Sequence, residues 1–299
     1  MPVSAAYLGI VLIWSTIPLT IQWSTQGVDF ALAVLGRMLI GLAVAICIQY
    51  VGRIRFPTHR RALLSYVVGG LGLFASMTLT YWAARFIYSG LISVMFGLAP
   101  LMAGVLAALL LDEKSLTPWK VFGTMLGIAG LGVIFLTGDR LGGEHFVGGL
   151  AALLAAVFFY SACLVGLKRI GDDSPPLATT VGSLAVATPL FAVLWLVVGT
   201  ALPDEIPWRT GVAIVYLGVF GSAVGFTLYY YVVKHMHAAR VALITLITPV
   251  VALLLGNLLN GERITPNLAV GSILILLGLI AHQREPRWSL LQRLWSRLR

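Results

Sequence analysis

Two stretches of this chain, LDEKSLTP at residues 111–118 and LNGERITP at residues 259–266, decide its fold because the second repeats the first. Each follows an apolar segment that contains a proline, and each precedes a glycine-rich apolar segment. In both, a Thr-Pro pair stands where a helix is expected to begin. Threonine can cap the first turn, and proline fits a position whose N–H needs no acceptor. The 299-residue chain therefore reads as two related halves.

The similarity between the halves extends beyond these turns. Residues of the first half align with like residues of the second, namely Tyr81 with Tyr230, Trp82 with Tyr231, Pro100 with Pro249, Gly123 with Gly271 and Gly130 with Gly278. Pro100 and Pro249 lie inside apolar runs, where proline removes a backbone hydrogen bond and favours a kink. We therefore predict gating or hinge positions at these two prolines.

The composition indicates that lipid is the main solvent of this chain. It is 59% apolar and 10% charged, with a mean hydropathy of +0.96, whereas soluble domains carry about 25% charged residues. A membrane span needs about 20 apolar residues. We predict an all-α integral membrane protein with ten transmembrane helices at residues 3–22, 30–51, 62–84, 88–111, 119–137, 147–167, 177–200, 210–233, 239–259 and 266–283. Residues 1–137 form a first five-helix repeat and residues 138–283 a second.

The basic residues predict how these spans are oriented. Fifteen of the 20 Lys and Arg residues fall on one side, four fall on the other, and Arg37 lies inside a span. The more basic side is expected in the cytoplasm, which places both termini in the cytoplasm of a bacterial-type inner membrane. Since five is an odd number, the second repeat must be inverted relative to the first. Orientation also explains the net charge of +9, so we expect no nucleic-acid partner.

The tail at residues 284–299 is predicted to be a basic amphipathic cytoplasmic helix. Its apolar residues recur at helical spacing among arginines, as Trp288, Leu291, Leu294, Trp295 and Leu298. Such helices lie on anionic lipid surfaces. A disordered basic tail is the alternative.

The sequence lacks the patterns of familiar catalytic sites. It contains neither HExxH nor GxSxG, and Ser222 of the GSAVG segment at residues 221–225 stands one position too early for a nucleophile elbow. Its glycines suit close helix packing better. Cys47 and Cys163 lie in apolar runs and predict no disulfide or metal site. We therefore expect no enzyme activity and no cofactor, and a membrane-embedded enzyme is the least favoured alternative.

Inverted repeats are typical of secondary transporters, which bind substrate near the midplane and rock their halves about it. No acidic residue falls near the middle of a predicted span, whereas aromatic and hydroxyl side chains are frequent there. Such a cavity suits a zwitterion with an apolar side chain. The candidate substrate-binding residues are Trp14, Ser15, Arg37, Tyr81, Trp82, Phe96, Phe159, Tyr160, Thr245 and Asn257.

Two alternatives stay open for these residues. Arg37 would meet a substrate carboxylate, or it would neutralise backbone carbonyls and a nearby acid within the fold. Tryptophan and tyrosine side chains also form belts at membrane interfaces, so each ring could belong to a belt.

The chain resembles the EamA-type branch of the drug/metabolite transporter superfamily. The resemblance is carried by the order of the two acidic Thr-Pro turns and of the proline-containing and glycine-rich spans, together with Trp14-Ser15 and Arg37. More narrowly, the chain is similar to the aromatic amino acid exporters of that family. The resemblance implies ten helices, a central cavity and outward movement of amino acids such as phenylalanine, tyrosine and tryptophan.

The partners expected are an amino acid substrate and membrane lipid, with the chain acting as a monomer. The alternative is a carrier for another small metabolite, such as a nucleotide sugar or a phosphate ester, which would need several buried Lys or Arg residues.

Overall fold

The computed structural model describes residues 2–111, 117–135, 145–198, 202–225, 228, 232, 236 and 238–283 (of residues 135, 238–243 and 283, the backbone alone). Tyr230, Tyr231 and the predicted amphipathic tail at residues 284–299 lie outside these residues. Within them the secondary structure is helical throughout, with no strand. The first half consists of α1 (Val3–Ser24), α2 (Phe30–Val51), α3 (Arg60–Ala83), α4 (Ser89–Phe96), α5 (Ala99–Leu110) and α6 (Pro118–Phe135).

The second half consists of α8 (Phe146–Ile170), α9 (Pro176–Val198), α10 (Trp208–Tyr216), the π-helix η1 (Leu217–Val224), α12 (Ala238–Asn260) and α13 (Pro266–Gln283). Where the structure describes them, the bounds fall within three residues of the predicted spans.

Among the described residues, six helical segments are long and apolar enough to cross a membrane, with α4 and α5 counted as one segment. Four shorter apolar helices, Pro118–Ile134, Trp208–Val224, Ile244–Asn260 and Pro266–His282, accompany them. Many large apolar side chains, such as Leu12, Leu109 and Leu196, are exposed on the outer faces of these helices. Acyl chains cover such side chains in a membrane, as expected for a multi-pass protein.

The predicted helix caps at the two Thr-Pro pairs are confirmed. The Thr117 hydroxyl oxygen accepts a hydrogen bond from the Lys120 amide at 3.3 Å, and α6 begins at Pro118. The Thr265 hydroxyl accepts from the Leu268 amide at 3.3 Å, and α13 begins at Pro266. The repeated sequence therefore builds the same local structure twice.

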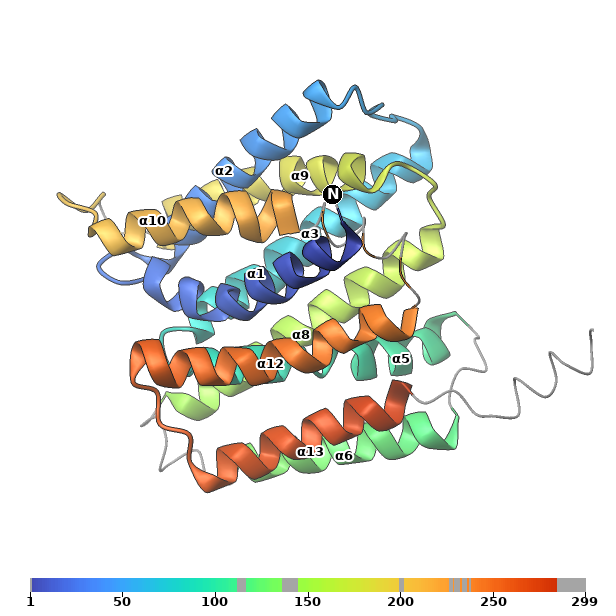
Figure 1. Cartoon of the computed structure of the whole chain (residues 1–299). Helices are drawn as coiled ribbons and strands as arrows, with labels where there is room; N and C mark the ends of the chain where they lie inside the picture. Colours follow the sequence, from blue (N-terminus) through green and yellow to red (C-terminus); the bar gives the residue numbers. More distant parts are fainter. Residues whose placement is uncertain are drawn as a thin grey trace, which may run out of the picture.

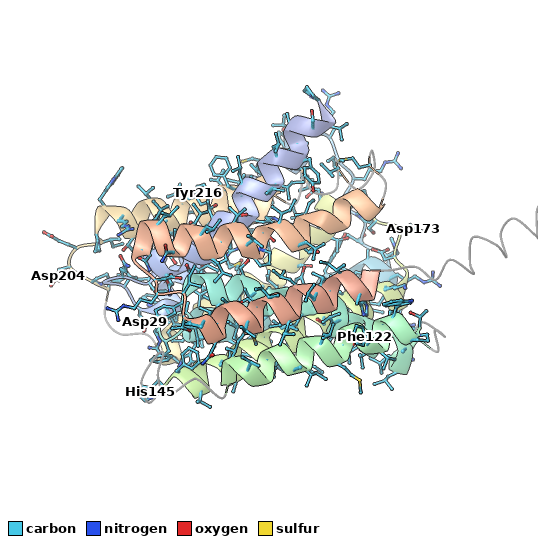
Figure 2. The ribbon with its side chains drawn as sticks, turned by 60° about the horizontal axis from the view of Figure 1, so that its bottom comes forward. Asp29, Phe122, His145, Asp173, Asp204 and Tyr216 are labelled. Carbon is cyan, nitrogen blue, oxygen red and sulfur yellow. The ribbon has the colours of Figure 1, made fainter. Side chains whose placement is uncertain are left out.

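The helices run roughly alongside one another, and α6 and α13 lie side by side at the lower edge of the bundle (Figure 1). Figure 2 shows Asp29, His145 and Asp204 at one end of the bundle and Asp173 at the other. We call these the Asp29 end and the Asp173 end. At the Asp29 end, the side-chain amide of Gln22 donates to the Ile87 carbonyl at 2.6 Å. The Asp173 end contains the contact between His59 and Asp172.

Glycines allow α6 and α13 to cross at close range. A Cβ added at Gly123 would collide with the carbonyl oxygen of Gly278, and one at Gly278 would lie 2.5 Å from the carbonyl oxygen of Gly123. The second pair behaves alike: a Cβ at Gly130 would lie 2.6 Å from the Gly271 oxygen, and one at Gly271 would lie 2.8 Å from the Gly130 oxygen. Without side chains the two backbones approach directly, as at small-residue interfaces in membranes.

The two candidate hinge prolines lie in different local structures. The fourth predicted span is interrupted at Gly97 and Leu98, and Pro100 stands in the first turn of α5. By contrast, α12 continues as a helix through Pro249. A helix interruption therefore accompanies Pro100 but not Pro249.

Candidate functional site

Arg37 is the central residue of the candidate site. It lies on α2 and is only 6% exposed, and its Nε donates a long hydrogen bond of 3.4 Å to the hydroxyl of Ser222 on η1. Its Nη1 is buried and has no hydrogen-bond partner among the described residues. The only ion pair within the described part of the chain joins His59 and Asp172, so no described carboxylate neutralises this guanidinium.

The Ser222 side chain also contacts the backbone of the π-helix beside Arg37. The Ser222 hydroxyl donates to the carbonyl of Leu217, five residues earlier, at 3.3 Å. The element η1 is itself a π-helix, a form that is frequent at functional sites. The same hydroxyl thus accepts from Arg37 and donates to the η1 backbone.

Close packing of α2 against η1 makes this contact possible. A Cβ added at Gly41 would lie 2.9 Å from the Ser222 Cβ, and one at Gly218 would lie 2.6 Å from Ile40 Cγ2. A Cβ at Gly221 would lie 3.4 Å from Arg37 Nη2. The glycines expected from the sequence to serve helix packing therefore also surround the buried guanidinium.

Trp14 on α1 forms the third side of this site. A Cβ added at Gly225 would lie 3.3 Å from the indole nitrogen of Trp14, and a Cβ added at Gly221 would lie 3.6 Å from Ile17 of α1. Because Gly221 also approaches Arg37 of α2, these glycines face both α1 and α2. The next residue, Ser15, is fully buried, and its hydroxyl has no hydrogen-bond partner among the described residues. Trp14 and Arg37 are thus brought to one small-residue face.

A second group of candidates gathers at the interruption between α4 and α5. The rings of Phe96 and Tyr160 meet edge to face with centroids 5.8 Å apart. The adjacent Ser161 hydroxyl donates to the Ala99 carbonyl at 3.1 Å. Here α8 of the second half supports the interrupted helix of the first half.

Tyr81 and Trp82 lie at the end of α3. Tyr81 is fully buried, and its hydroxyl has no hydrogen-bond partner among the described residues. Trp82 packs edge to face against Phe86 at 5.1 Å, and the Arg85 guanidinium lies 5.7 Å from its ring centroid. Tyr81 therefore faces the protein interior, whereas Trp82 joins an aromatic and cationic group at the Asp29 end.

The remaining candidates are Phe159, Thr245 and Asn257. Phe159 is 42% exposed, and its ring contacts Phe158 with centroids 5.6 Å apart. Thr245 is half-buried in α12. The side-chain amide of Asn257 donates to the Glu262 carbonyl at 2.8 Å, which ties the end of α12 to the following turn. The structure thus gives Asn257 a contact within its own turn.

Sequence reasoning found Arg37 but not its partner. The sequence predicts only helix packing for the GSAVG segment that contains Ser222, and no pattern in it joins residues 185 positions apart. One local signal does exist: Gly41 lies four residues after Arg37, on the same face of α2. A small residue there signals that another element approaches near the arginine.

The apolar helical bundle is that of a multi-pass membrane protein. The chain belongs to the EamA-like transporter family, whose profile matches it twice, at residues 3–136 and 147–281. Members of this family are transporters and not enzymes.

Several relatives carry transporter names. The chain is 30% identical to an uncharacterized transporter of Archaeoglobus fulgidus over 199 residues. The aligned region covers 65% of this chain and 67% of that protein. It is 26% identical to a probable terminal-alkyne amino-acid exporter of Streptantibioticus cattleyicolor, over 91% of this chain and 93% of that protein. It is 28% identical to a probable amino-acid metabolite efflux pump of Escherichia coli, over 84% and 86% of the two chains.

A solved crystal structure shares the fold. It superposes with a TM-score of 0.63 at 23% identity and covers 94% of this chain and 96% of the other. The agreement extends over both halves of the chain.

Proposed function

We propose that this chain exports amino acids with apolar side chains, in particular aromatic ones, by alternating access between two inverted halves in a bacterial-type inner membrane. The observation that carries the proposal is the buried guanidinium of Arg37, which has an unpartnered Nη1 and no described acid beside it. A buried charge is costly unless it is paired. A substrate carboxylate supplies the missing acceptor through charge-assisted hydrogen bonds.

The surroundings of Arg37 support an apolar body on the same substrate. Trp14 and Ile17 approach the glycine face of η1 from α1, so rings and aliphatic groups flank the guanidinium. A pocket with one polar anchor and apolar walls orients a small amphipathic molecule. The names of the Streptantibioticus and Escherichia relatives point to the same substrate class.

The inverted arrangement is supported by the contacts between α6 and α13. The alignment of the halves pairs Gly123 with Gly271 and Gly130 with Gly278. If each glycine is replaced by its counterpart in the other half, Gly123 becomes Gly271 and Gly278 becomes Gly130. The contact between Gly123 and Gly278 then becomes the contact between Gly271 and Gly130, which the structure also contains. A pseudo-two-fold axis between the halves has this property, and such an axis in the membrane plane relates inverted repeats.

The distribution of basic residues supports a cytoplasmic Asp173 end. The described basic residues near that end include Arg53, Arg55, Arg60, Arg61, Lys120, Lys168 and Arg169, whereas Arg85, Arg209 and Arg263 lie near the Asp29 end. The positive-inside rule assigns the first group to the cytoplasm. Since α1 begins at that end, the proposal places Val3 on the cytoplasmic side.

The alternative of a phosphate-ester carrier finds less support. Such a substrate needs several cations in its site, and Arg37 is the only buried Lys or Arg in the described part of the chain.

The test is counterflow in proteoliposomes with a panel of labelled amino acids, with and without imposed pH and voltage gradients. We expect exchange of aromatic amino acids by the wild type. Arg37→Gln should lower exchange at least tenfold, and the Arg55→Gln variant, which removes an exposed charge, should retain it. Normal exchange by folded Arg37→Gln protein would overturn the role of Arg37, and exchange of no amino acid would overturn the substrate class.

A further inference from the structure

Side-chain hydrogen bonds join the two halves of the chain at the Asp29 end. Three segments meet there: the end of α1, the start of α4, and the turn between α12 and α13. The Asn260 side-chain amide donates to Gln22 Oε1 at 3.0 Å, and the Trp23 indole N–H donates to Asn260 Oδ1 at 3.3 Å. Asn260 therefore ties the second half of the chain to α1 of the first half.

The same turn of the second half is also bound to the start of α4. The Glu262 carboxylate accepts hydrogen bonds from the amides of Ser89 and Gly90 at 3.0 and 3.2 Å. Just before α4, the Ile87 carbonyl accepts from the Gln22 side chain at 2.6 Å. The bonds thus form one connected network over α1, α4 and the α12–α13 turn.

Burial increases from the outside of this network inward. Asn260 is exposed, whereas Glu262 and Ser89 are 6% and 0% exposed. Below them α4 and α12 touch directly, since a Cβ added at Gly90 would lie 2.6 Å from Cδ2 of Leu253. The network therefore closes the outer end of the contact between α4 and α12.

One face of α1 leads from this network to the Arg37 site. Ser15 precedes Gln22 by seven residues, which is about two helical turns, so both side chains lie on the same face of α1. The α1 helix packs against both α4 and α12, and Trp14, the neighbour of Ser15, belongs to the Arg37 site. A substrate that left this site along that face would have to pass the network.

We propose that Gln22, Asn260 and Glu262 form a gate at the Asp29 end, which is closed in this structure and opens when their hydrogen bonds between the halves break. The inference rests on the alternating access proposed above, because it assigns the contact that must separate for substrate to leave at this end. One net hydrogen bond changes an equilibrium by about fivefold. A few such bonds hold the closed state while the open state stays populated enough to be used.

The gate is tested by labelling introduced cysteines with a membrane-impermeant thiol reagent from the outside of intact cells. Cys47→Ala and Cys163→Ser first remove the two native thiols. Ser89→Cys then places a probe inside the network, and Ser15→Cys, in a separate protein, places one beside the Arg37 site. Neither serine hydroxyl has a hydrogen-bond partner among the described residues, so each thiol replaces it without loss of a described side-chain bond.

We expect slow labelling of both probes while the network is intact. Asn260→Ala and Gln22→Leu should each accelerate labelling of both probes at least fivefold, because each removes hydrogen bonds between the halves. Opening of the gate exposes both probes, whereas fraying of the turn would expose the probe at position 89 alone. Asn267→Ala, at an exposed asparagine of the same end, is the matched control and should leave both rates unchanged.

Three results would overturn the gate: unchanged labelling in the folded Asn260→Ala and Gln22→Leu proteins, acceleration at position 89 alone, or equal acceleration by Asn267→Ala. Labelling of inside-out vesicles separates the gate from the orientation. Acceleration there but not in cells would overturn the proposed orientation alone. Because labelling needs no substrate, a failure of amino acid exchange would overturn the proposed substrate class and not the gate.

Discussion

Glu262, in the acidic turn of the second half, caps a helix of the first half at Ser89. Its Oε1 accepts a hydrogen bond from the Ser89 amide at 3.0 Å, and its Oε2 accepts from the Gly90 amide at 3.2 Å. The Asn260 side chain donates to the same carboxylate at 3.2 Å. Although Glu262 is only 6% exposed, its charge is therefore matched by the amides at the start of α4.

The first prediction concerns this cap. We expect Glu262→Ala to lower the free energy of unfolding by about 2 kcal/mol, because it leaves two buried amides without acceptors. Glu262→Gln keeps one carbonyl acceptor and should cost about half as much. Thermal unfolding in detergent measures both. Asp204→Asn, at an exposed acid near the same end, is the control, and an equal loss in that variant would contradict the role of the cap.

The second prediction concerns the crossing of α6 and α13. Gly123→Ala should destabilise the protein by about 1–3 kcal/mol, because its Cβ would collide with the backbone of α13 and force the helices apart. Gly132→Ala on the same helix is the matched control, since a Cβ there meets nothing within 4 Å. Calorimetric or fluorescence melting of the two variants gives the comparison. If both alanines were tolerated alike, the close crossing would not hold in the membrane protein.

Hydropathy was sufficient to predict the helices, because lipid imposes an apolar length on each span regardless of its neighbours. The Thr-Pro caps were also predictable, since a cap depends on residues within one turn. The contact between Glu262 and Ser89 was not, because it joins residues 173 positions apart and requires the packing of α12 on α4.

The two prolines, of which only Pro100 accompanies a helix interruption, also show that one residue does not by itself predict the local structure. Pro100 follows Gly97, which weakens the helix and allows it to break. Leu246 occupies the position of the second half that corresponds to Gly97, and α12 continues past Pro249. Proline alone suggested two equivalent hinges, whereas the neighbouring residue determined where the helix was interrupted.

The third prediction concerns acid stability at the Asp173 end. Burial of Asp172, whose side chain is 4% exposed, would raise its pKa, but the polar groups of the nearby Ser174 and the hydrogen bond and charge of His59 outweigh it. The pKa of Asp172 therefore lies below its usual value of 3.8. The stabilisation is fully present above the unfolded pKa near 3.8 and is lost as the pH falls through the lower folded value.

Asp172→Asn removes this ionisation, so its Tm should lie below that of the wild type at pH 6 and converge with it as the pH falls below about 3.8. The difference at pH 6 should correspond to about 1 kcal/mol or less, because His59 is largely exposed to solvent. Melting curves between pH 3 and pH 7 measure it. Asp173→Asn serves as the control, and a difference that grew toward low pH would contradict the assignment.

The fourth prediction tests whether Arg37 serves the substrate or only the fold. Ser222→Asp places a carboxylate where the Ser222 hydroxyl now meets Arg37. If Arg37 binds the substrate carboxylate, the new aspartate competes with it, and exchange in proteoliposomes should fall at least tenfold. The fold should persist, since the buried guanidinium gains a charged partner. Ser222→Asn, which is nearly isosteric with aspartate but uncharged, should retain most of the exchange. Had Arg37 only a structural role, the aspartate would stabilise the protein and leave exchange as high as in the asparagine variant.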